Sequence, residues 1–275
     1  MNSYRKGIDV SEHNGIIDWG QVKASGMEFA MIRAGYGQRL DRQFRRNIEE
    51  CIRTGLPCGV YWFSYAQDAA GAAREAAACL NAIAPCPVTL PVAYDLEYDT
   101  IRYAQTQGVT IGMETASDMA RSFCRAIRET GHPVINYANP DYLSRYFDEQ
   151  IQTEFPLWLA QWPNGTPDLS QPPRACEMWQ YSAKGRVPGI TGPVDLDVCY
   201  VAYPKNGKEN PTMTGEQIYH TLNAYLNTLP IPEWAEKEYA EARALGITDG
   251  KNPLQLIPRY QAAIMAKRAM SANPQ

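Results

Sequence analysis

Short apolar runs typical of β-strands alternate with helical segments along this chain from residue 6 onward. Such alternation is typical of a parallel sheet or barrel in which helices connect successive strands. The eight runs predicted to be strands are residues 6–11, 29–34, 58–65, 91–97, 133–137, 157–162, 176–182 and 194–200. Helical patterns follow the first five runs, whereas loops separate the last three.

Capping residues mark where several of these helices begin and end. Asp18 and Asp68 stand where a carboxylate can accept backbone N–H groups of a first helical turn, and Asn139 precedes a proline in the same role. Gly55 can adopt the left-handed conformation that ends a helix. A long amphipathic helix is predicted over residues 110–131.

These elements predict an α/β fold, a modified TIM-like β/α barrel of eight strands with about five flanking helices. A barrel of about 200–250 residues fits into the chain of 275 with a short segment left over. A polar stretch at residues 205–211 is typical of a linker. The predicted domains are therefore a barrel over 1–205 and a small helical appendage over 206–275, with helical patterns at 215–229, 233–244 and 258–270.

Composition argues against several classes of function. A net charge of −4 provides no basic field for a phosphate backbone, so nucleic acid is not expected as a partner. No segment is apolar over the length of a membrane span, so no membrane insertion is expected. The three histidines lack ligand spacing, which argues against zinc. The seven cysteines lack CxxC spacing, and we expect buried thiols at positions such as Cys51, Cys79 and Cys124.

Four acidic residues lie inside or at the end of predicted strands, namely Asp9, Asp95, Glu97 and Asp195. In a parallel barrel the carboxyl ends of the strands build the active site, so these carboxylates are predicted to converge. Asp95 and Glu97 stand two apart in one run and should project from the same face. Two close carboxylates cannot both ionise easily, so one can keep its proton and act as a general acid.

Other interpretations of these acids compete with catalysis. A lone strand-end aspartate more often accepts hydrogen bonds from loop amides or caps a helix, although the Asp95 and Glu97 pair in an apolar run favours function. The same residue types could also hold Mg²⁺ or Ca²⁺. Aromatic residues near strand ends could stack on a glycan or pack in the core, and these are Tyr61, Tyr65, Tyr137, Trp158 and Tyr181.

Several motifs, in order along the chain, resemble glycoside hydrolase family 25, the Chalaropsis-type lysozymes. The opening Gly7-Ile8-Asp9-Val10-Ser11 with Asn14-Gly15 and Ile17-Asp18-Trp19 resembles the start of that family. Tyr94-Asp95-Leu96-Glu97 is similar to its Asp-x-Glu strand, Trp179-Gln180-Tyr181-Ser182 to its penultimate strand, and Val194-Asp195-Leu196-Asp197 to its final motif. The resemblance covers residues 5–203.

The resemblance implies an enzyme that hydrolyses the β-1,4 bond between N-acetylmuramic acid and N-acetylglucosamine in bacterial peptidoglycan. Glu97 would be the general acid/base, and Asp95 would steady an intermediate formed by the acetamido group of the substrate. Asp9 and Asp195 would hold charge around the site, or one of them would activate water in an inverting reaction. No metal and no cofactor are implied. The predicted substrate-binding residues are Arg33, Tyr61, Tyr137, Trp158 and Gln180.

The sequence departs from the family pattern at two positions. Asp197 stands where many relatives have asparagine, and Trp62 stands where a histidine is common, so the aromatic wall is expected to differ there. The tail beyond residue 206 lies outside the resemblance. It is loosely similar to surface-layer-homology-like helical segments, and wall binding and bracing of the barrel are equal alternatives for it.

Two functions of other classes compete with the lysozyme hypothesis, a catalytically silent glycan-binding barrel and a metal-dependent phosphodiesterase. The presence of both Asp95 and Glu97 favours the enzyme, and the few histidines argue against the phosphodiesterase. Residues 1–6 lack the features of a secretory signal. A protein acting on the cell wall would then be a phage endolysin released by a holin, or a secreted protein with its signal removed.

Overall fold

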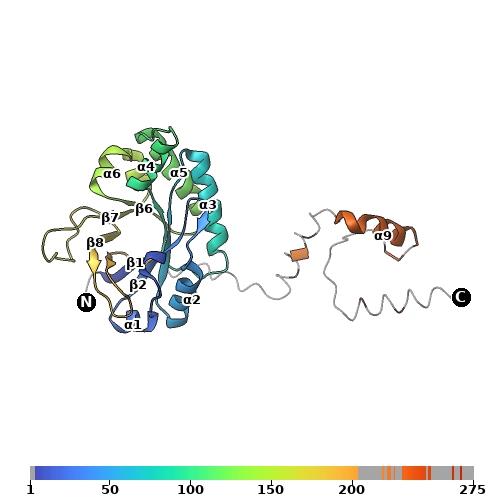
Figure 1. Ribbon diagram of the computed structural model, residues 1–275, viewed down its shortest axis with the longest axis horizontal. Helices are drawn as coiled ribbons and strands as arrows, with labels where there is room; N and C mark the ends of the chain where they lie inside the picture. Colours follow the sequence, from blue (N-terminus) through green and yellow to red (C-terminus); the bar gives the residue numbers. More distant parts are fainter. Residues whose placement is uncertain are drawn as a thin grey trace. The chain divides into compact units, whose positions relative to one another are not determined.

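The computed structural model describes residues 4–203, 219, 222, 223, 226, 231–245, 247, 248, 262 and 267. The chain divides into two compact units, Met1–Gly207 and Lys208–Gln275, which we describe separately. Figure 1 shows the first unit as strands surrounded by helices. The catalytic and wall-binding roles predicted for the two parts of the chain stay predictions.

Residues 4–203 contain nine strands, eight of which form a closed barrel. Their bounds are β1 Arg5–Val10, β2 Phe29–Tyr36, β3 Arg39–Leu40, β4 Cys58–Phe63, β5 Val92–Asp95, β6 Val134–Ala138, β7 Leu157–Ala160, β8 Met178–Gly185 and β9 Val194–Cys199. The order is β1-β9-β8-β7-β6-β5-β4-β2-β3, and the barrel closes because β1 also pairs with β2. The predicted eight-stranded barrel is confirmed. The short β3, which forms a hairpin with β2, was not predicted.

The last barrel strand runs against its neighbours. β9 is antiparallel to both β8 and β1, whereas the other barrel strands pair in parallel. The start of β9 therefore lies beside the carboxyl ends of the parallel strands. Antiparallel pairing needs no crossover helix, which explains why the chain enters β9 through a loop. The barrel is mixed, which the alternating pattern of the sequence did not reveal.

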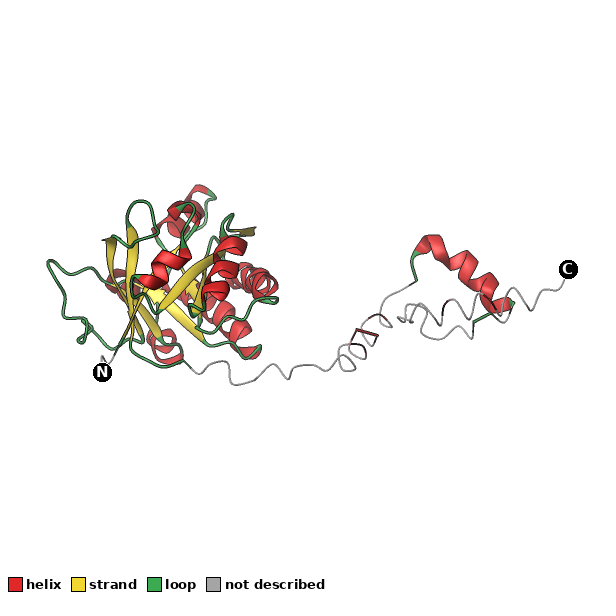
Figure 2. Cartoon of the chain, turned by 90° about the horizontal axis from the view of Figure 1, so that it is seen from below, coloured by secondary structure: helices red, strands yellow, loops and turns green. Residues whose placement is uncertain are grey.

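Helices follow the first five barrel strands, as predicted, and cover the outside of the barrel (Figure 2). Their bounds are η1 Glu12–Asn14, α1 Trp19–Ala24, α2 Phe44–Thr54, α3 Ala69–Ile83, α4 Tyr98–Thr106, α5 Met113–Glu129, α6 Pro140–Arg145 and α7 Glu149–Glu154. The sequence predicted neither α4 nor α7. No helix occurs in the described segment between β7 and β9.

The predicted helix caps are present. The Asp18 and Asp68 carboxylates accept hydrogen bonds from backbone N–H groups of their first turns, over 3.1 and 2.6 Å. The Asn139 side chain does the same for α6 over 2.9 Å. Gly55 ends α2 with φ 67°, a conformation that favours glycine. Local hydrogen bonding thus sets these helix ends.

Two separate cores follow from the alternation of side chains along the strands. The larger core lies between strands and helices, and the predicted buried thiols Cys51, Cys79 and Cys124 belong to it. The smaller core fills the barrel interior and consists of Phe29, Met31, Leu90, Ala93, Ile135, Trp158, Met178 and Cys199. Apolar packing fills the barrel near the amino ends of the parallel strands, which leaves the carboxyl ends of these strands for polar groups.

The described part of the C-terminal unit contains helix α9, Glu233–Ala244, which agrees with the helix predicted over 233–244. Its Trp234 is 80% exposed. The other two predicted helices fall on residues that are largely outside the described ones. Among the described residues, no helix has the length and apolar character needed to cross a membrane.

Candidate active site

The four predicted acids lie at one end of the barrel. Asp9 is on β1, Asp95 ends β5, Glu97 directly precedes α4, and Asp195 is the second residue of β9. Asp195 reaches this end only because β9 is antiparallel, and its Cα pairs with that of Asp9. The expectation that it lies at the carboxyl end of a parallel strand was therefore wrong, although the acids do come together.

Asp95 and Glu97 do not both belong to a strand, which corrects the prediction. β5 ends at Asp95, and Glu97 is the N-cap residue of α4. Its backbone is still extended, with φ −129° and ψ −179°, and Leu96 between the two acids is buried in the outer core. The charge of Glu97 contributes to raising the pKa of Asp95, so the two acids interact as expected.

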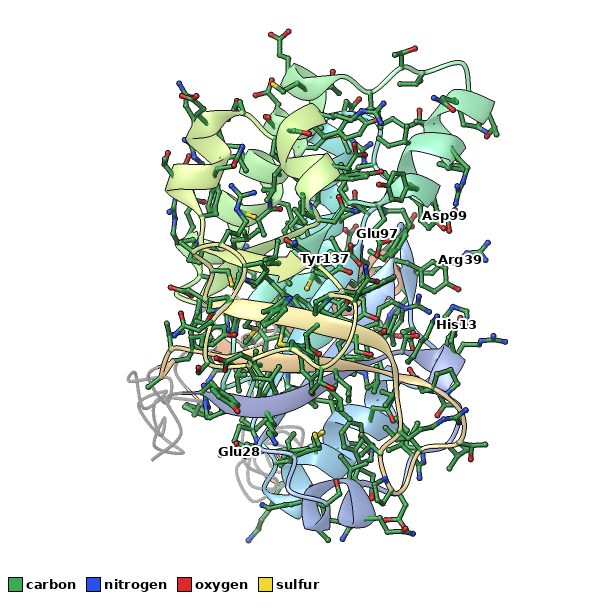
Figure 3. All side chains as sticks on the ribbon, turned by 90° about the vertical axis from the view of Figure 1, so that its left-hand side faces the viewer. His13, Glu28, Arg39, Glu97, Asp99 and Tyr137 are labelled. Atoms are coloured by element: carbon green, nitrogen blue, oxygen red, sulfur yellow. The ribbon has the colours of Figure 1, made fainter. Side chains whose placement is uncertain are left out.

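Glu97 has the properties of a general acid. Burial, together with the charges of Asp99 and Asp195, raises its pKa to about 7. A carboxyl group with such a pKa is substantially protonated near neutral pH and can both donate and accept a proton there. Figure 3 shows Glu97 near Tyr137 of β6, whose pKa is raised well above its usual value by burial and, second, by the charge of Glu97.

Asp95 is a buried carboxyl group with an unused oxygen. It is 4% exposed, and its Oδ1 has no hydrogen-bond partner in the protein. Burial is the main cause that raises its pKa well above the usual range, Glu97 adds to the shift, and Arg33 opposes it. A buried polar atom without a partner is costly unless a ligand supplies one.

Arg33, a predicted substrate-binding residue, is held within the protein. Its Nε donates to Asp41 Oδ2 over 2.8 Å, and its Nη2 lies 3.5 Å from Glu12 Oε1. The guanidinium also lies 4.9 Å from the ring centre of Tyr36. Its charge acts on Asp95 from this fixed position, and direct contact with substrate stays a prediction.

Gln180, another predicted substrate-binding residue, joins several groups of the site. Its Nε2 donates to Asp9 Oδ2 over 2.8 Å. Its Oε1 accepts from Tyr137 Oη and from Trp162 Nε1, each over 3.1 Å. The amide is thereby fixed in one orientation, because a flip that exchanged its nitrogen and oxygen would lose all three hydrogen bonds.

Of the three aromatic residues predicted to bind substrate, Tyr61 and Tyr137 are half-buried and Trp158 is buried. Trp158 is 2% exposed and lies edge-on to Tyr61 and Tyr137, with ring centres 6.1 and 4.9 Å away. Its Nε1 donates to Asp197 Oδ1 over 2.8 Å. Trp158 therefore packs against the buried edges of both tyrosines, and of these three rings those of Tyr61 and Tyr137 retain surface for a ligand.

Three aromatic predictions need correction or extension. Tyr181 packs in the outer core against Trp179, so it forms no wall of the site. Trp62 is also buried in the outer core, so it contributes no surface to the wall. Tyr65 contacts Phe63 and Tyr103, each with ring centres 5.2 Å apart.

Trp162 is an aromatic residue of the site that was not predicted from the sequence. It is 59% exposed and hydrogen-bonded to Gln180. The only sequence signal was its position at the end of the run 157–162.

Within the described residues, no group of three or more His, Cys, Asp or Glu side chains is arranged to hold a metal ion.

The sequence profile of glycosyl hydrolases family 25 matches residues 8–190, about two thirds of the chain. The chain belongs to glycosyl hydrolases family 25. Asp9, Asp95 and Glu97 lie within the matched segment of this family-25 protein, whereas Asp195 and Asp197 lie just beyond it.

Known proteins similar to this family-25 chain include a lysozyme. Lysozyme M1 of Streptomyces globisporus is 31% identical over 198 residues, which are 69% of this chain and 66% of that lysozyme. YegX of Escherichia coli strain K12, described as uncharacterized, is 29% identical and covers 70% of this chain and 68% of its own length.

Among solved structures, the modular autolysin LytC of Streptococcus pneumoniae, in complex with a synthetic peptidoglycan ligand, is 25% identical with a TM-score of 0.62. That likeness covers 71% of this chain and 46% of LytC. The family-25 chain thus spans less than half of that autolysin and about two thirds of the lysozyme. The fold is the family-25 mixed barrel.

Proposed function

We propose that this protein is a muramidase that hydrolyses the β-1,4 bond between N-acetylmuramic acid and N-acetylglucosamine in bacterial peptidoglycan. The observation that carries the proposal is the pair of acids Asp95 and Glu97, of which Asp95 is buried with an unpartnered oxygen and Glu97 is half-buried with a pKa of about 7. The kinship with a lysozyme, and the peptidoglycan ligand bound by LytC, support this substrate class.

In the proposed reaction, protonated Glu97 donates its proton to the glycosidic oxygen as the bond to the anomeric carbon breaks. The acetamido oxygen of the substrate attacks the anomeric carbon and forms an oxazolinium-like intermediate. Asp95 Oδ1 accepts a hydrogen bond from the acetamido N–H and stabilises the positive charge. Glu97, now a carboxylate, then takes a proton from the water that opens this intermediate, which restores the enzyme.

Asp9 and Asp195 provide a second route in which one of them activates water for direct, inverting attack. The two routes predict different products. Participation of the acetamido group retains the anomeric configuration, whereas direct attack inverts it. NMR of the anomer formed immediately after cleavage distinguishes them, and failure to cleave N-deacetylated glycan would further support participation.

The experiment that tests the proposed function is digestion of purified peptidoglycan, with mass spectrometry of the new reducing ends. A muramidase releases chains that end in N-acetylmuramic acid. Ends that carry N-acetylglucosamine would assign cleavage to the other glycosidic bond. Binding without any new reducing end would instead identify a catalytically silent glycan-binding barrel.

A further inference from the structure

Three aspartates face the barrel interior from the pair of strands β1 and β9. Asp9 lies opposite Asp195, and Asp197 lies opposite Gly7. Residues two apart in a strand share a face, so Asp195 and Asp197 both project toward Asp9. A Cβ atom at Gly7 would lie 2.4 Å from the Phe29 ring, so the residue opposite Asp197 has no room for a side chain.

The carboxyl groups of Asp9 and Asp197 lie close enough to act on each other's pKa through side-chain hydrogen bonding. One oxygen of each carboxyl group already has a donor. Gln180 Nε2 donates to Asp9 Oδ2 and Trp158 Nε1 donates to Asp197 Oδ1, each over 2.8 Å. Asp197 is fully buried, and its Oδ2 has no hydrogen-bond partner among the donors of the protein. Two ionised carboxylates have no hydrogen to share, so a hydrogen bond between these two groups needs one proton.

The surroundings of the pair favour retention of that proton. Burial raises the pKa of Asp9 well above its usual range, and the charges of Asp197 and Asp195 raise it further. Burial likewise raises the pKa of Asp197 to about 7. The other titratable groups that face Asp9 are Tyr61 on β4 and Tyr137 on β6. Burial raises the pKa of both tyrosines, so both are neutral near pH 7.

The pair is linked through Gln180 to the surface. Asp9 holds the Gln180 amide so that its Oε1 faces the indole N–H of Trp162. The backbone beside that tryptophan is also fixed, because Gln161 N donates to Gln180 O over 3.1 Å and Trp179 Nε1 donates to Gln161 O over 2.7 Å. The Trp162 side chain is thus held at its N–H edge and remains 59% exposed.

We propose that Asp9 and Asp197 hold a single proton between their carboxyl groups, and that this pair, acting through Gln180, positions Trp162 as a stacking face for a sugar ring of the substrate. Asp197 is then a positioning residue. The nature of the ligand rests on the proposed glycan-cleaving function. Exposed aromatic faces with a hydrogen-bonded edge suit a sugar ring, which presents an apolar face and a polar rim.

Loss of the shared proton would place two negative charges side by side. Their repulsion would move Asp9 and release the Gln180 amide, so the Trp162 indole would lose its fixed position. Substrate binding should weaken while the proton transfer by Glu97 continues. The pair therefore acts on KM, whereas titration of Glu97 acts on kcat.

Carbon-13 NMR of the full chain labelled at its aspartate carboxyl groups tests the shared proton without any substrate. The Asp9 and Asp197 signals are assigned from their absence in Asp9→Asn and Asp197→Asn. We expect them to titrate in two coupled steps, with one proton retained to about pH 7. Independent loss of both protons in the range of ordinary aspartates would overturn the proposal, whether or not the protein cleaves glycan.

Kinetics on a soluble peptidoglycan glycan test the link to Trp162. In the wild type KM should rise about tenfold as the pH passes above 7, the size of one stacked aromatic contact. In Asp197→Asn, whose amide donates to Asp9 at every pH, KM should stay low. Asp168→Asn, the same change on an exposed loop residue, should behave as the wild type.

Trp162→Ala should raise KM about tenfold at pH 6 and remove its pH dependence. A KM that rises equally in Asp197→Asn and the wild type would overturn the link. If no variant or wild type cleaves glycan, the proposed function fails, and the dissociation constant of the same glycan, followed by tryptophan fluorescence, replaces KM. The proposal on Asp197 is then supported or overturned by the same comparison.

Discussion

Asp9 on β1 and Asp195 on β9 are direct partners across an antiparallel pair of strands, so two carboxyl groups far apart in the sequence share one face of the barrel. Asp197 joins them from two residues further along β9. Asp95 and Glu97 come from the opposite side of the barrel through β5 and the start of α4. The site thus concentrates acids whose pKa values are raised mainly by burial.

Glu97→Gln should abolish turnover while the protein stays folded, because the amide keeps the shape of the side chain but cannot donate the proton. In the wild type, kcat should fall as the pH rises through about 7, since the acid form of Glu97 is then lost. Turbidity of cell walls measures the loss. Glu129→Gln, an exposed residue at the end of α5, is the matched control. Normal lysis by folded Glu97→Gln would remove Glu97 from the acid role.

Asp95→Asn should lower kcat by about two orders of magnitude, the usual scale for a preorganised electrostatic group. The amide would present its own N–H or a weaker acceptor to the acetamido group, and it could not balance positive charge. Initial rates on a soluble glycan provide the measurement, with Asp168→Asn as the control. A folded Asp95→Asn protein with near wild-type kcat would contradict participation of Asp95.

Exhaustive treatment with EDTA should leave activity unchanged, because the proposed reaction uses carboxyl groups and the acetamido group of the substrate. The assay compares wall lysis before and after chelation. Loss of lysis that Mg²⁺ or Ca²⁺ restores would favour the metal-dependent alternative, in which the same acids bind the ion.

Stability should fall as the pH rises from about 4 to about 8. The raised pKa values mean that folded Asp95, Glu97 and Asp197 keep protons that the unfolded chain releases. The free energy of unfolding therefore decreases with increasing pH. Asp197→Asn needs no titratable proton and should raise Tm by about 5 °C at pH 8, with little change at pH 5. Thermal unfolding followed by circular dichroism measures both, and equal shifts at the two pH values would contradict the titration of Asp197.

Removal of residues 208–275 should leave cleavage of short soluble glycans largely intact but weaken lysis of whole walls. The acids and their partners all lie in the unit Met1–Gly207, and a second wall-binding surface would raise the local concentration of enzyme on an insoluble polymer. Parallel assays on soluble glycan and intact walls measure the two effects. Unfolding, or an equal loss in both assays, would show that the tail braces the barrel.

Local patterns in the sequence were sufficient to predict the barrel strands, the helices after the first five of them and several helix caps. Side-chain alternation and capping act over a few residues, so a linear sequence contains them in full. The grouping of Asp9, Asp95, Glu97 and Asp195 also followed from their positions near strand ends. The family motifs in order identified the same residues.

The direction of β9, the place of Glu97 at a helix start and the contacts of Asp197 and Trp162 were decided only by the tertiary structure. Pairing direction depends on how the barrel closes, and side chains far apart in sequence meet only after closure. Burial then changes chemistry that composition cannot reveal. Asp197 is one acid among thirty in the sequence, but opposite Gly7 and beside Asp9 it lies in a site where burial favours its protonated form.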